Sequence, residues 1–172
     1  AAPGNVEYDA EEGSGRGVPG CRVVIATCQE KAAAVSAIGI TNQRETVVLW
    51  HRSSGQAIAP AIVWQDRRTS ALCKQLREAG HEPAVRQQTG LLLDPYFSAS
   101  KMKWLLDQDQ GLRGRASKGE LCFGTIDSWL LFRLSGGAHY TDATNAARTM
   151  LCDVRTGQWS DELCALDRES VV

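Results

Sequence analysis

The stretch "AIGITNQRETVVLW", residues 37–50, holds two apolar segments separated by polar residues. Residues 36–40 are typical of a short buried strand, and the β-branched and aromatic side chains at 46–50 favour a second strand. Arg44 and Glu45 stand side by side between the two. Because consecutive side chains of a strand point to opposite faces, this pair can serve one ligand only where the backbone turns at a strand end. Such strand ends are where open α/β sheets bind ligands, so the pair marks a candidate site.

The pattern continues with a third strand and then changes to a helix. Residues 57–64 ("AIAPAIVW") predict a buried strand, and residues 51–56 ("HRSSGQ") predict the turn before it. After Asp66 the apolar residues take helical spacing, and Gly80 can end that helix. The residues on its predicted buried face are Leu72, Leu76 and Ala79.

The second half of the chain predicts helices joined by turns, with one strand among them. Each predicted helix follows a serine or threonine that can cap its first turn: Ser98 or Ser100, Thr125, and Ser160. A short apolar strand at 121–124 leads into the helix after Thr125. Strands that give way to helices predict an α/β fold. The side chains expected to be buried in these helices are Met102, Leu105, Leu106, Ile126, Trp129, Leu130, Leu134, Leu163 and Leu166.

Composition places the chain among ordinary globular proteins. Of its 172 residues, 43% are hydrophobic and 23% are charged, which is enough for one hydrophobic core. The 19 basic residues are interspersed with 20 acidic ones, and the net charge is -1, which argues against a nucleic-acid-binding surface. No apolar run approaches the roughly 18 residues of a membrane span, and the acidic start of the chain does not resemble a signal peptide. We therefore expect a cytoplasmic protein that binds neither nucleic acid nor a membrane.

The six cysteines are expected to be free thiols. They form no C-x-x-C pair and lie at no metal-binding spacing from a histidine, and a chain of this length does not need disulfides to stabilise its core. We therefore expect neither a metal site nor a redox role. The cysteines are Cys21, Cys28, Cys73, Cys122, Cys152 and Cys164.

Residues 13–20 ("GSGRGVPG") predict a flexible connector, because glycine and proline sustain neither a helix nor a central strand. Gly15, Gly17 and Gly20 satisfy the G-x-G-x-x-G spacing of dinucleotide sites, but such a site needs a strand before it and a helix after it. Here an acidic segment precedes the glycines and Pro19 interrupts them. Phosphate binding by this segment is therefore not expected.

The Arg44–Glu45 pair suits a small polyol. Each hydroxyl group both donates and accepts hydrogen bonds, whereas a guanidinium only donates and a carboxylate only accepts. Two aromatic side chains also have polar neighbours: Trp64 could cover the carbon face of a polyol, and Tyr96, after the turn-forming Asp94-Pro95, could bind one hydroxyl. Two plainer interpretations remain open, namely a weak ion pair on the surface and core packing of the indole ring.

Other polar residues are weaker candidates. Asp127 lies on a predicted core helix, and Asp142 and Asn145 are turn and cap formers that most often bond their own backbone. The histidines have no nucleophile nearby in the sequence, and the Gly-Lys-Ser or Gly-Lys-Thr of a phosphate-binding loop does not occur.

Five segments, in order, resemble the amino-terminal half of the glycerol kinases, which belong to the FGGY carbohydrate kinases. The residues from Tyr96 to Gln108 also fit the first signature of that family. The resemblance covers residues 35–165 in separate blocks. These are "AIGITNQRE" (37–45), "AIVWQDRRT" (61–69), "TGLLLDPYFSASKMKWLLD" (89–107), "FGTIDSWLLFRLSGG" (123–137) and "TDATNAARTML" (141–151).

The resemblance implies a fold, a reaction and a set of site residues. The fold is α/β, of the actin and RNase H-like ATPase type, and the reaction transfers the γ-phosphoryl group of ATP to glycerol with the help of Mg2+. Arg44, Glu45 and Tyr96 would hydrogen-bond glycerol, and Trp64 would pack on its carbon skeleton. Other sugar kinases of the family carry different residues in place of the Arg-Glu motif, which favours glycerol as the substrate.

The chain also departs from the family pattern. The family's strand and turn of the type "DQGTTSSR", which holds the phosphates of ATP, has no counterpart here, and the catalytic base is expected beyond Val172. Residues 1–34 match poorly and are expected to be partly flexible, whereas residues 35–172 fit part of an FGGY N-terminal domain that lacks its first strands. No catalytic residue is assigned within the chain, and neither ATP nor Mg2+ is expected to bind it well.

Three interpretations follow from these observations. The first is a fragment of a glycerol kinase, inactive by itself, whose full-length enzyme could be a homo-oligomer. The second is a non-catalytic module that binds a polyol or pairs with another subunit through an exposed sheet edge. The third keeps the FGGY kinase fold but changes the substrate to another polyol or sugar, because a shared fold does not determine the substrate.

Overall fold

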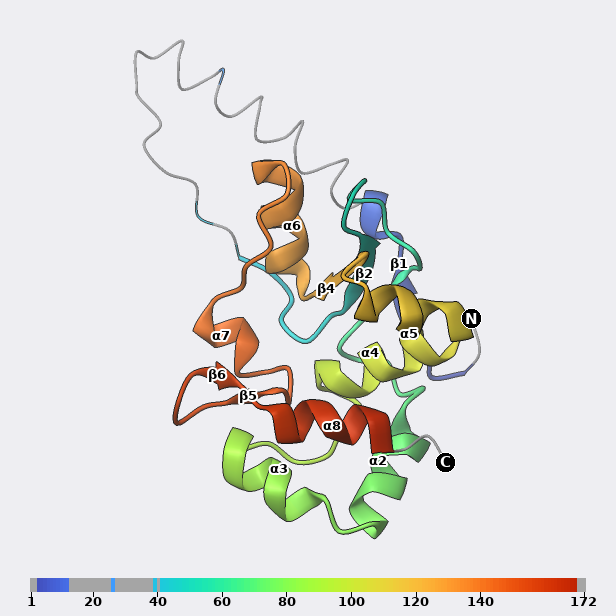
Figure 1. The fold of residues 1–172 in the computed structure, drawn as a ribbon, viewed down its shortest axis with the longest axis vertical. Helices are drawn as coiled ribbons and strands as arrows, with labels where there is room; N and C mark the ends of the chain where they lie inside the picture. Colours follow the sequence, from blue (N-terminus) through green and yellow to red (C-terminus); the bar gives the residue numbers. More distant parts are fainter. Residues whose placement is uncertain (1–2, 13–25, 27–38, 40, 170–172) are drawn as a thin grey trace.

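The computed structural model describes residues 3–12, 26, 39 and 41–169, and the side chains of these residues as far as Leu166 (Figure 1). The predicted connector at 13–20 lies outside the described residues, and so does the predicted strand at 36–40 except for Gly39. The description of the fold therefore begins at the polar segment that follows this strand.

Four short antiparallel strands form the sheet. Strand β1 (Glu7–Tyr8) pairs with β3 (Ala61–Ile62), and β2 (Val48–His51) pairs with β4 (Leu121–Gly124). A bridge between Val47 and Ile62 joins the two pairs, which gives the spatial order β1-β3-β2-β4. The strands predicted within 46–50, 57–64 and 121–124 are thus confirmed, although those at 46–50 and 57–64 are shorter or shifted. The predicted turn at 51–56 is also confirmed, because the Gly55 amide donates to the His51 carbonyl at 2.8 Å.

Alternate side chains of β2 supply two apolar layers, one on each face of the sheet. Val48 and Trp50 pack with Trp129 and Phe132 of α6 (Ile126–Ser135), and the Trp50 and Trp129 rings meet edge to face at 5.3 Å. On the opposite face, Val47 and Leu49 pack with leucines of α4 (Ser98–Asp107) and α5 (Gln110–Ser117), namely Leu105, Leu106 and Leu112. Figure 1 shows α6 on one side of the strands and α4 and α5 on the other.

A third apolar cluster lies among the remaining helices below the sheet in Figure 1 and has members from all of them except the short helix at 143–146. These are α2 (Ser70–Glu78), α3 (Glu82–Thr89), the short α7 (Ala143–Ala146) and α8 (Asp161–Glu169), with a two-stranded ribbon of β5 (Cys152–Asp153) and β6 (Gln158–Trp159) between α7 and α8. The buried members of the cluster are Val85, Leu91, Leu93, Phe97, Met150 and Leu163.

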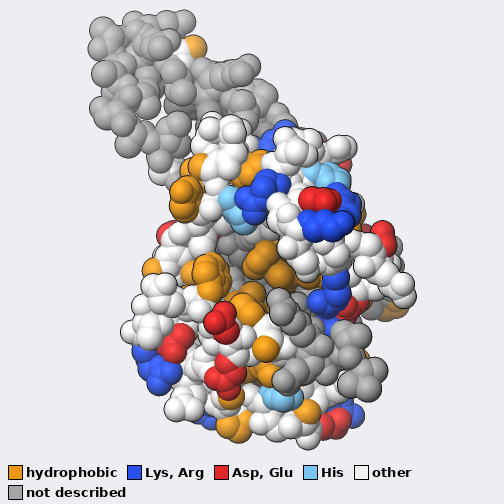
Figure 2. All heavy atoms as spheres, viewed as in Figure 1, with side chains coloured by type: hydrophobic (Ala, Val, Ile, Leu, Met, Phe, Trp, Pro, Cys, Tyr) orange, Lys and Arg blue, Asp and Glu red, His pale blue; other side chains and the backbone are white. Residues whose placement is uncertain are grey.

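Between the sheet and these helices the surface is hollowed. Figure 2 shows hydrophobic side chains gathered around a hollow at the centre of this face. A cavity of about 460 Å³ lies there, and its lining includes Met102, Phe123, Leu151 and Trp159.

The predicted helix caps are only partly right. Ser160 caps α8, since its Oγ accepts from the Leu163 amide at 3.2 Å, and Thr125 stands at the N-cap of α6 without a capping bond from its side chain. Ser98 and Ser100 do not cap α4, which has Phe97 at its N-cap position. Their hydroxyls bind distant segments instead: Ser98 contacts the Glu45 carbonyl and Ser100 contacts the Thr69 hydroxyl. Burial of Leu134 was also wrongly predicted, because its side chain is 46% exposed.

Candidate functional site

A tight turn separates the side chains of Arg44 and Glu45. Glu45 has a φ of 63°, which is unusual for a residue other than glycine, and the Thr46 amide donates to the Arg44 carbonyl at 2.8 Å. The Glu45 side chain is therefore turned into the protein, where the residue is 3% exposed, whereas Arg44 is exposed. Adjacent residues in the sequence thus reach different environments.

Glu45 is paired with Arg148 of the segment that follows α7. Nε of Arg148 donates to Oε1 of Glu45 at 2.7 Å. The same guanidinium lies over the ring of Phe97, 4.9 Å from its centroid, and 5.8 Å from the centroid of Tyr96. Sequence reasoning missed Arg148 because 103 residues separate it from Glu45 and no spacing links the two.

Trp64 and Tyr96 lie together, as the polyol hypothesis requires. Their ring centroids are 5.3 Å apart, with an interplanar angle of 56°, and both residues are only partly buried. The backbone amide of Trp64 donates to Oγ1 of Thr46 at 3.3 Å, which ties the indole-bearing segment to the turn at Glu45. Trp64 is therefore not a fully buried core residue.

A surface hollow of about 410 Å³ lies beside these side chains. It is large enough for a small ligand. Tyr96 and Arg148 contribute to its lining, whereas Arg44, Glu45 and Trp64 are not among the residues that line it. The lining residues are Gly90, Leu91, Leu92, Asp94, Tyr96, Phe97 and Arg148.

The structure thus brings three of the four predicted site residues into one connected group. Arg148 links Glu45 to Tyr96, and Tyr96 contacts Trp64. The side chain of Arg44 forms no hydrogen bond or ion pair with another residue in the described ranges, and its donors remain open to solvent. The group offers a carboxylate, cationic donors and aromatic faces, which together suit a ligand with hydroxyl groups on a carbon chain.

Side-chain hydrogen bonds of Asp94 and Ser98 hold the Tyr96 segment. The Tyr96 amide donates to Oδ1 of Asp94 at 2.8 Å, and Nη1 of Arg67 donates to the same oxygen at 2.9 Å. Ser98 Oγ, at the start of α4, donates to the Glu45 carbonyl at 3.3 Å. The turn at Glu45 and the segment of Tyr96 are thereby fixed relative to one another.

Asp66 anchors the segment that follows Trp64. Its carboxylate accepts from the side chain of Arg68 at 2.8 and 2.9 Å and from the Val6 amide at 2.5 Å, and the residue is 1% exposed. Burial acts to raise the pKa of Asp66, but the hydrogen bonds from Arg68 and Val6 outweigh it, so the pKa lies below its ordinary value. Asp66 is therefore an ionised structural group.

A polar network joins the other end of the turn to α6 and α7. Nδ2 of Asn42 donates to Asp127 at 3.3 Å and to Oδ1 of Asn145 at 3.1 Å. Asp142 caps α7 by accepting from the Asn145 amide at 2.8 Å, and this bond lowers the pKa of Asp142. The interpretation of Asp142 as a cap former is confirmed. Because Arg148 follows α7 directly, the network also helps to place the partner of Glu45.

The described ranges also show how the cysteines and the potential metal ligands are arranged. These ranges contain no cluster of three or more His, Cys, Asp or Glu side chains that could hold a metal ion. Cys73, Cys122 and Cys152 are buried free thiols, and burial raises the pKa of each. No helix within residues 3–12 and 41–169 is long and apolar enough to cross a membrane.

Comparison with other sequences relates the chain to carbohydrate kinases. The profile described as FGGY family of carbohydrate kinases, N-terminal domain, matches residues 2–167. Glycerol kinase of Rhodospirillum rubrum is 56% identical over 166 residues, which cover 96% of this chain and 34% of that protein. Glycerol kinase of Rhodopseudomonas palustris is 57% identical over 166 residues, with 96% and 33% covered. The chain thus spans about a third of the length of the curated relatives it matches.

Solved structures agree with this relationship. The crystal structure of Plasmodium falciparum glycerol kinase with ADP matches with a TM-score of 0.88 at 34% identity, over 98% of this chain and 34% of that one. Gluconate kinase of Lactobacillus acidophilus matches with a TM-score of 0.82 over 98% of this chain and 32% of that one, and at 20% identity it shows the shared fold alone. The predicted α/β fold of the actin and RNase H-like ATPase type is confirmed.

The match to the family profile begins at residue 2 and therefore includes most of the segment 1–34. The predicted boundary between this segment and the domain at 35–172 stays a prediction. With a profile match that covers nearly the whole chain, this protein belongs to the FGGY family of carbohydrate kinases.

Proposed function

We propose that this chain is part of a glycerol kinase and supplies half of its glycerol site. The observation that carries the proposal is the buried carboxylate of Glu45, held by Arg148 beside the ring pair of Tyr96 and Trp64. The high identity to relatives named glycerol kinase supports the same conclusion.

Each of the four predicted site residues has a distinct role in this proposal. Oε1 of Glu45 is occupied by Arg148, and Oε2 accepts no hydrogen bond from another described residue, so that it can accept from a hydroxyl group of glycerol. The exposed guanidinium of Arg44 donates to hydroxyl oxygens, and the phenol of Tyr96 binds a further hydroxyl. Trp64 covers the carbon skeleton with its indole face.

The reaction of the complete enzyme would transfer the γ-phosphoryl group of ATP to a terminal hydroxyl of glycerol and yield glycerol 3-phosphate. Such transfers depend mainly on positioning and charge stabilisation. The residues of this chain bind and orient the alcohol. We assign the binding of ATP and Mg2+, and the base that takes the hydroxyl proton, to parts of the complete enzyme outside the described residues.

The same proposal extends to the location, the ligand and the oligomeric state of the complete enzyme. A cytoplasmic location suits the free thiols of Cys73, Cys122 and Cys152, because the cytoplasm keeps thiols reduced. Glycerol is the proposed ligand. Homo-oligomer formation by the complete enzyme remains a prediction.

A chimera tests the proposal. Residues 2–167 replace the matching third of Rhodospirillum rubrum glycerol kinase, and ATP-dependent phosphorylation of glycerol is measured. We expect the chimera to be active and Arg44→Ala to lower kcat/KM for glycerol by about tenfold or more, as the loss of a charge-assisted hydrogen bond implies. Arg86→Ala, at another exposed arginine, should have no effect. An inactive but folded chimera would contradict the proposal.

The 172-residue chain alone is expected to be inactive. Turnover by the isolated chain that is abolished by Arg44→Ala would overturn this expectation. Calorimetry with glycerol distinguishes the alternative of a polyol-binding module, for which the isolated chain should bind glycerol and Glu45→Ala should lose binding. We expect no binding, because one side of a cleft rarely offsets the entropy lost by a small ligand.

The fold does not determine the substrate, because a gluconate kinase has the same fold. We favour glycerol on the strength of the relatives that are 56% and 57% identical and carry that name. In the chimera, kcat/KM for glycerol should exceed that for gluconate or xylulose. A preference for one of the sugars would support the third interpretation.

A further inference from the structure

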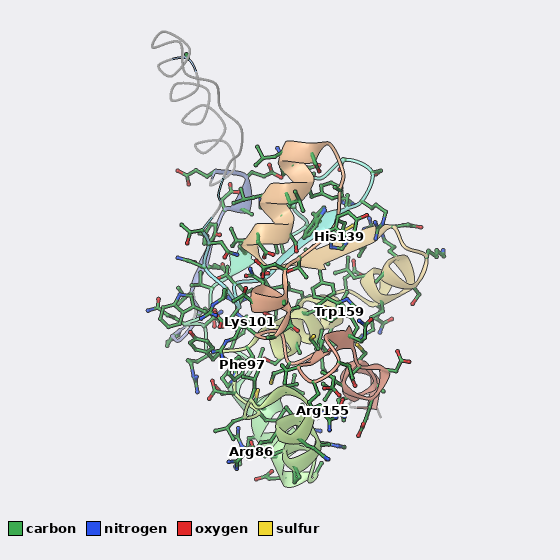
Figure 3. All side chains as sticks on the ribbon, turned by 90° about the vertical axis from the view of Figure 1, so that its left-hand side faces the viewer. Arg86, Phe97, Lys101, His139, Arg155 and Trp159 are labelled. Carbon is green, nitrogen blue, oxygen red and sulfur yellow. The ribbon has the colours of Figure 1, made fainter. Side chains whose placement is uncertain are left out.

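Lys101 is a charged residue that is completely buried. It lies in the first turns of α4 and is 0% exposed, although lysine is almost never buried without a partner. Nζ donates to three successive backbone carbonyls, those of Pro95 and Tyr96 at 2.6 Å each and that of Phe97 at 3.2 Å. The three donors of the ammonium group are thus all used, and Figure 3 shows Lys101 close to Phe97.

This contact is not an ordinary ion pair. No carboxylate among the described residues lies within salt-bridge distance of Lys101. Burial lowers the pKa of Lys101 to about 8 against the opposing effect of the nearby carboxylates of Asp66, Glu45 and Asp94. The carbonyls of the Tyr96 segment are therefore the main partners of this cation.

The first turns of α4 contact three segments of the candidate site. Lys101 holds the backbone at Tyr96, and Ser98 holds the carbonyl of Glu45. The Ala99 amide donates at 2.9 Å to the carbonyl of Thr149, the residue next to Arg148. A shift at this end of α4 would therefore alter the positions of three site residues at once.

We propose that Lys101 is a positioning residue of the glycerol site, which fixes the backbone of residues 95–97 and so places the Tyr96 side chain against Trp64 and Arg148. The inference rests on the proposed function, in which Tyr96 binds glycerol. Lys101 does not touch the hollow beside Tyr96 and acts only through the backbone.

The first test needs no ligand. In the 172-residue chain, hydrogen exchange of the Tyr96, Phe97 and Ala99 amides is compared between the wild type and Lys101→Met, which keeps the length of the side chain and removes its donors. We expect exchange at least about tenfold faster, because three backbone carbonyls of this segment lose their partner. Unchanged exchange in the folded variant would overturn the proposal.

Lys103→Met is the matched control. Lys103 lies on the same helix and is 5% exposed, but its Nζ binds Oδ2 of Asp107 at 2.8 Å and no carbonyl of residues 95–97. This variant should leave exchange at Tyr96 and Phe97 unchanged. An equal acceleration in both variants would mean that α4 is merely destabilised, and the proposal would be wrong.

If Lys101→Met does not fold, the contact of Lys101 is tested in the wild-type protein instead. Nuclear magnetic resonance of the ¹⁵N-labelled lysine ammonium groups should show slowly exchanging Hζ protons for Lys101 with scalar couplings to the carbonyls of residues 95–97. Fast exchange at every lysine would contradict the contact on which the inference depends.

The second test is a double-mutant cycle in the chimera. Lys101→Met and Tyr96→Phe should each raise KM for glycerol while KM for ATP stays the same. If Lys101 acts through Tyr96, the double variant should have a KM no higher than that of the weaker-binding single variant. If the increases in KM for glycerol of the two single variants multiply in the double variant, Lys101 acts by another route than Tyr96. Lack of activity in the parent chimera would contradict the proposed function, while the exchange experiment would still decide the role of Lys101.

Discussion

The Nε atom of Arg148 lies 2.7 Å from Oε1 of Glu45, across 103 residues of sequence. Glu45 reaches this partner because its backbone takes a φ of 63°, which turns the carboxylate inward while Arg44 stays exposed. A local backbone distortion of this kind is often found at functional sites. The ion pair therefore connects the turn before β2 with the end of α7.

Removal of Arg148 should leave the Glu45 carboxylate buried without its partner. We expect Arg148→Ala to lower the free energy of unfolding by about 1–3 kcal/mol, measured by urea denaturation at pH 7. Glu45→Gln in the Arg148→Ala background should recover part of this loss, because the amide carries no charge. Lys74→Ala, which breaks an exposed pair with Glu78, serves as the control and should leave stability unchanged. Lack of recovery in the double variant would contradict the pairing.

Asp66 should make a pH-dependent contribution to stability. Its pKa is lower in the folded protein than the ordinary value of 3.8, so its stabilisation is present above pH 3.8 and is lost as the pH falls through the folded-state value. Asp66→Asn should cost about 2–3 kcal/mol at pH 7, since Arg68 loses its buried charged partner. Urea titrations from pH 7 downward should show the difference between wild type and variant shrinking in strong acid. A difference that stays constant would rule out this role.

Lys101 should make the stability depend on pH in alkali, again with stability rising as the pH rises. Burial lowers its pKa from 10.5 to about 8, so the folded state holds the proton less tightly than the unfolded state does. The stability contributed by this residue is therefore lowest below about pH 8 and rises as the pH increases toward 10.5. Relative to Lys101→Met, the wild type should gain up to about 3 kcal/mol over this range. A difference that is independent of pH would contradict the burial of the ammonium.

Gly124 should tolerate no side chain, although its φ is not in the left-handed region. A Cβ atom at this position would lie 2.6 Å from Cβ of Ser128 and 3.2 Å from the ring of Trp50. We expect Gly124→Ala to destabilise the protein by about 1–3 kcal/mol because α6 must move away from β4. Gly114→Ala is the control, since nothing lies within 4 Å of its Cβ in α5, and it should stabilise by up to about 1 kcal/mol. Equal effects at the two sites would refute the close packing of α6 on β4.

The sequence predicted those parts of the fold that depend on local patterns. Strand β2 (Val48–His51) lies close to the segment 46–50, which the β-branched and aromatic residues indicated, and Gly80 follows the end of α2 with a φ of 86°. Helix α3 was missed because Glu82–Thr89 is mostly polar, and α7 because a helix of four residues has no periodicity.

The site was predicted less completely, because its contacts join distant segments. Ser98 looked like a helix cap, but its hydroxyl donates to the Glu45 carbonyl 53 residues away. Arg148 and Lys101 carry no local signal of their roles, since one binds a carboxylate from another segment and the other binds backbone carbonyls. The four predicted residues were chosen from their chemistry and supported by the family motifs, and only the fold reveals the groups that hold them in place.

Glu45 is the residue whose substitution tests the proposed glycerol site most directly. Glu45→Gln keeps the size of the side chain and removes its charge, so the kcat/KM for glycerol of the chimera is the quantity to measure. We predict a fall of about tenfold to a hundredfold with KM for ATP unchanged, as expected for a charged hydrogen bond to the substrate. A kcat/KM for glycerol equal to that of the parent chimera would contradict the assignment of Glu45 to the glycerol site.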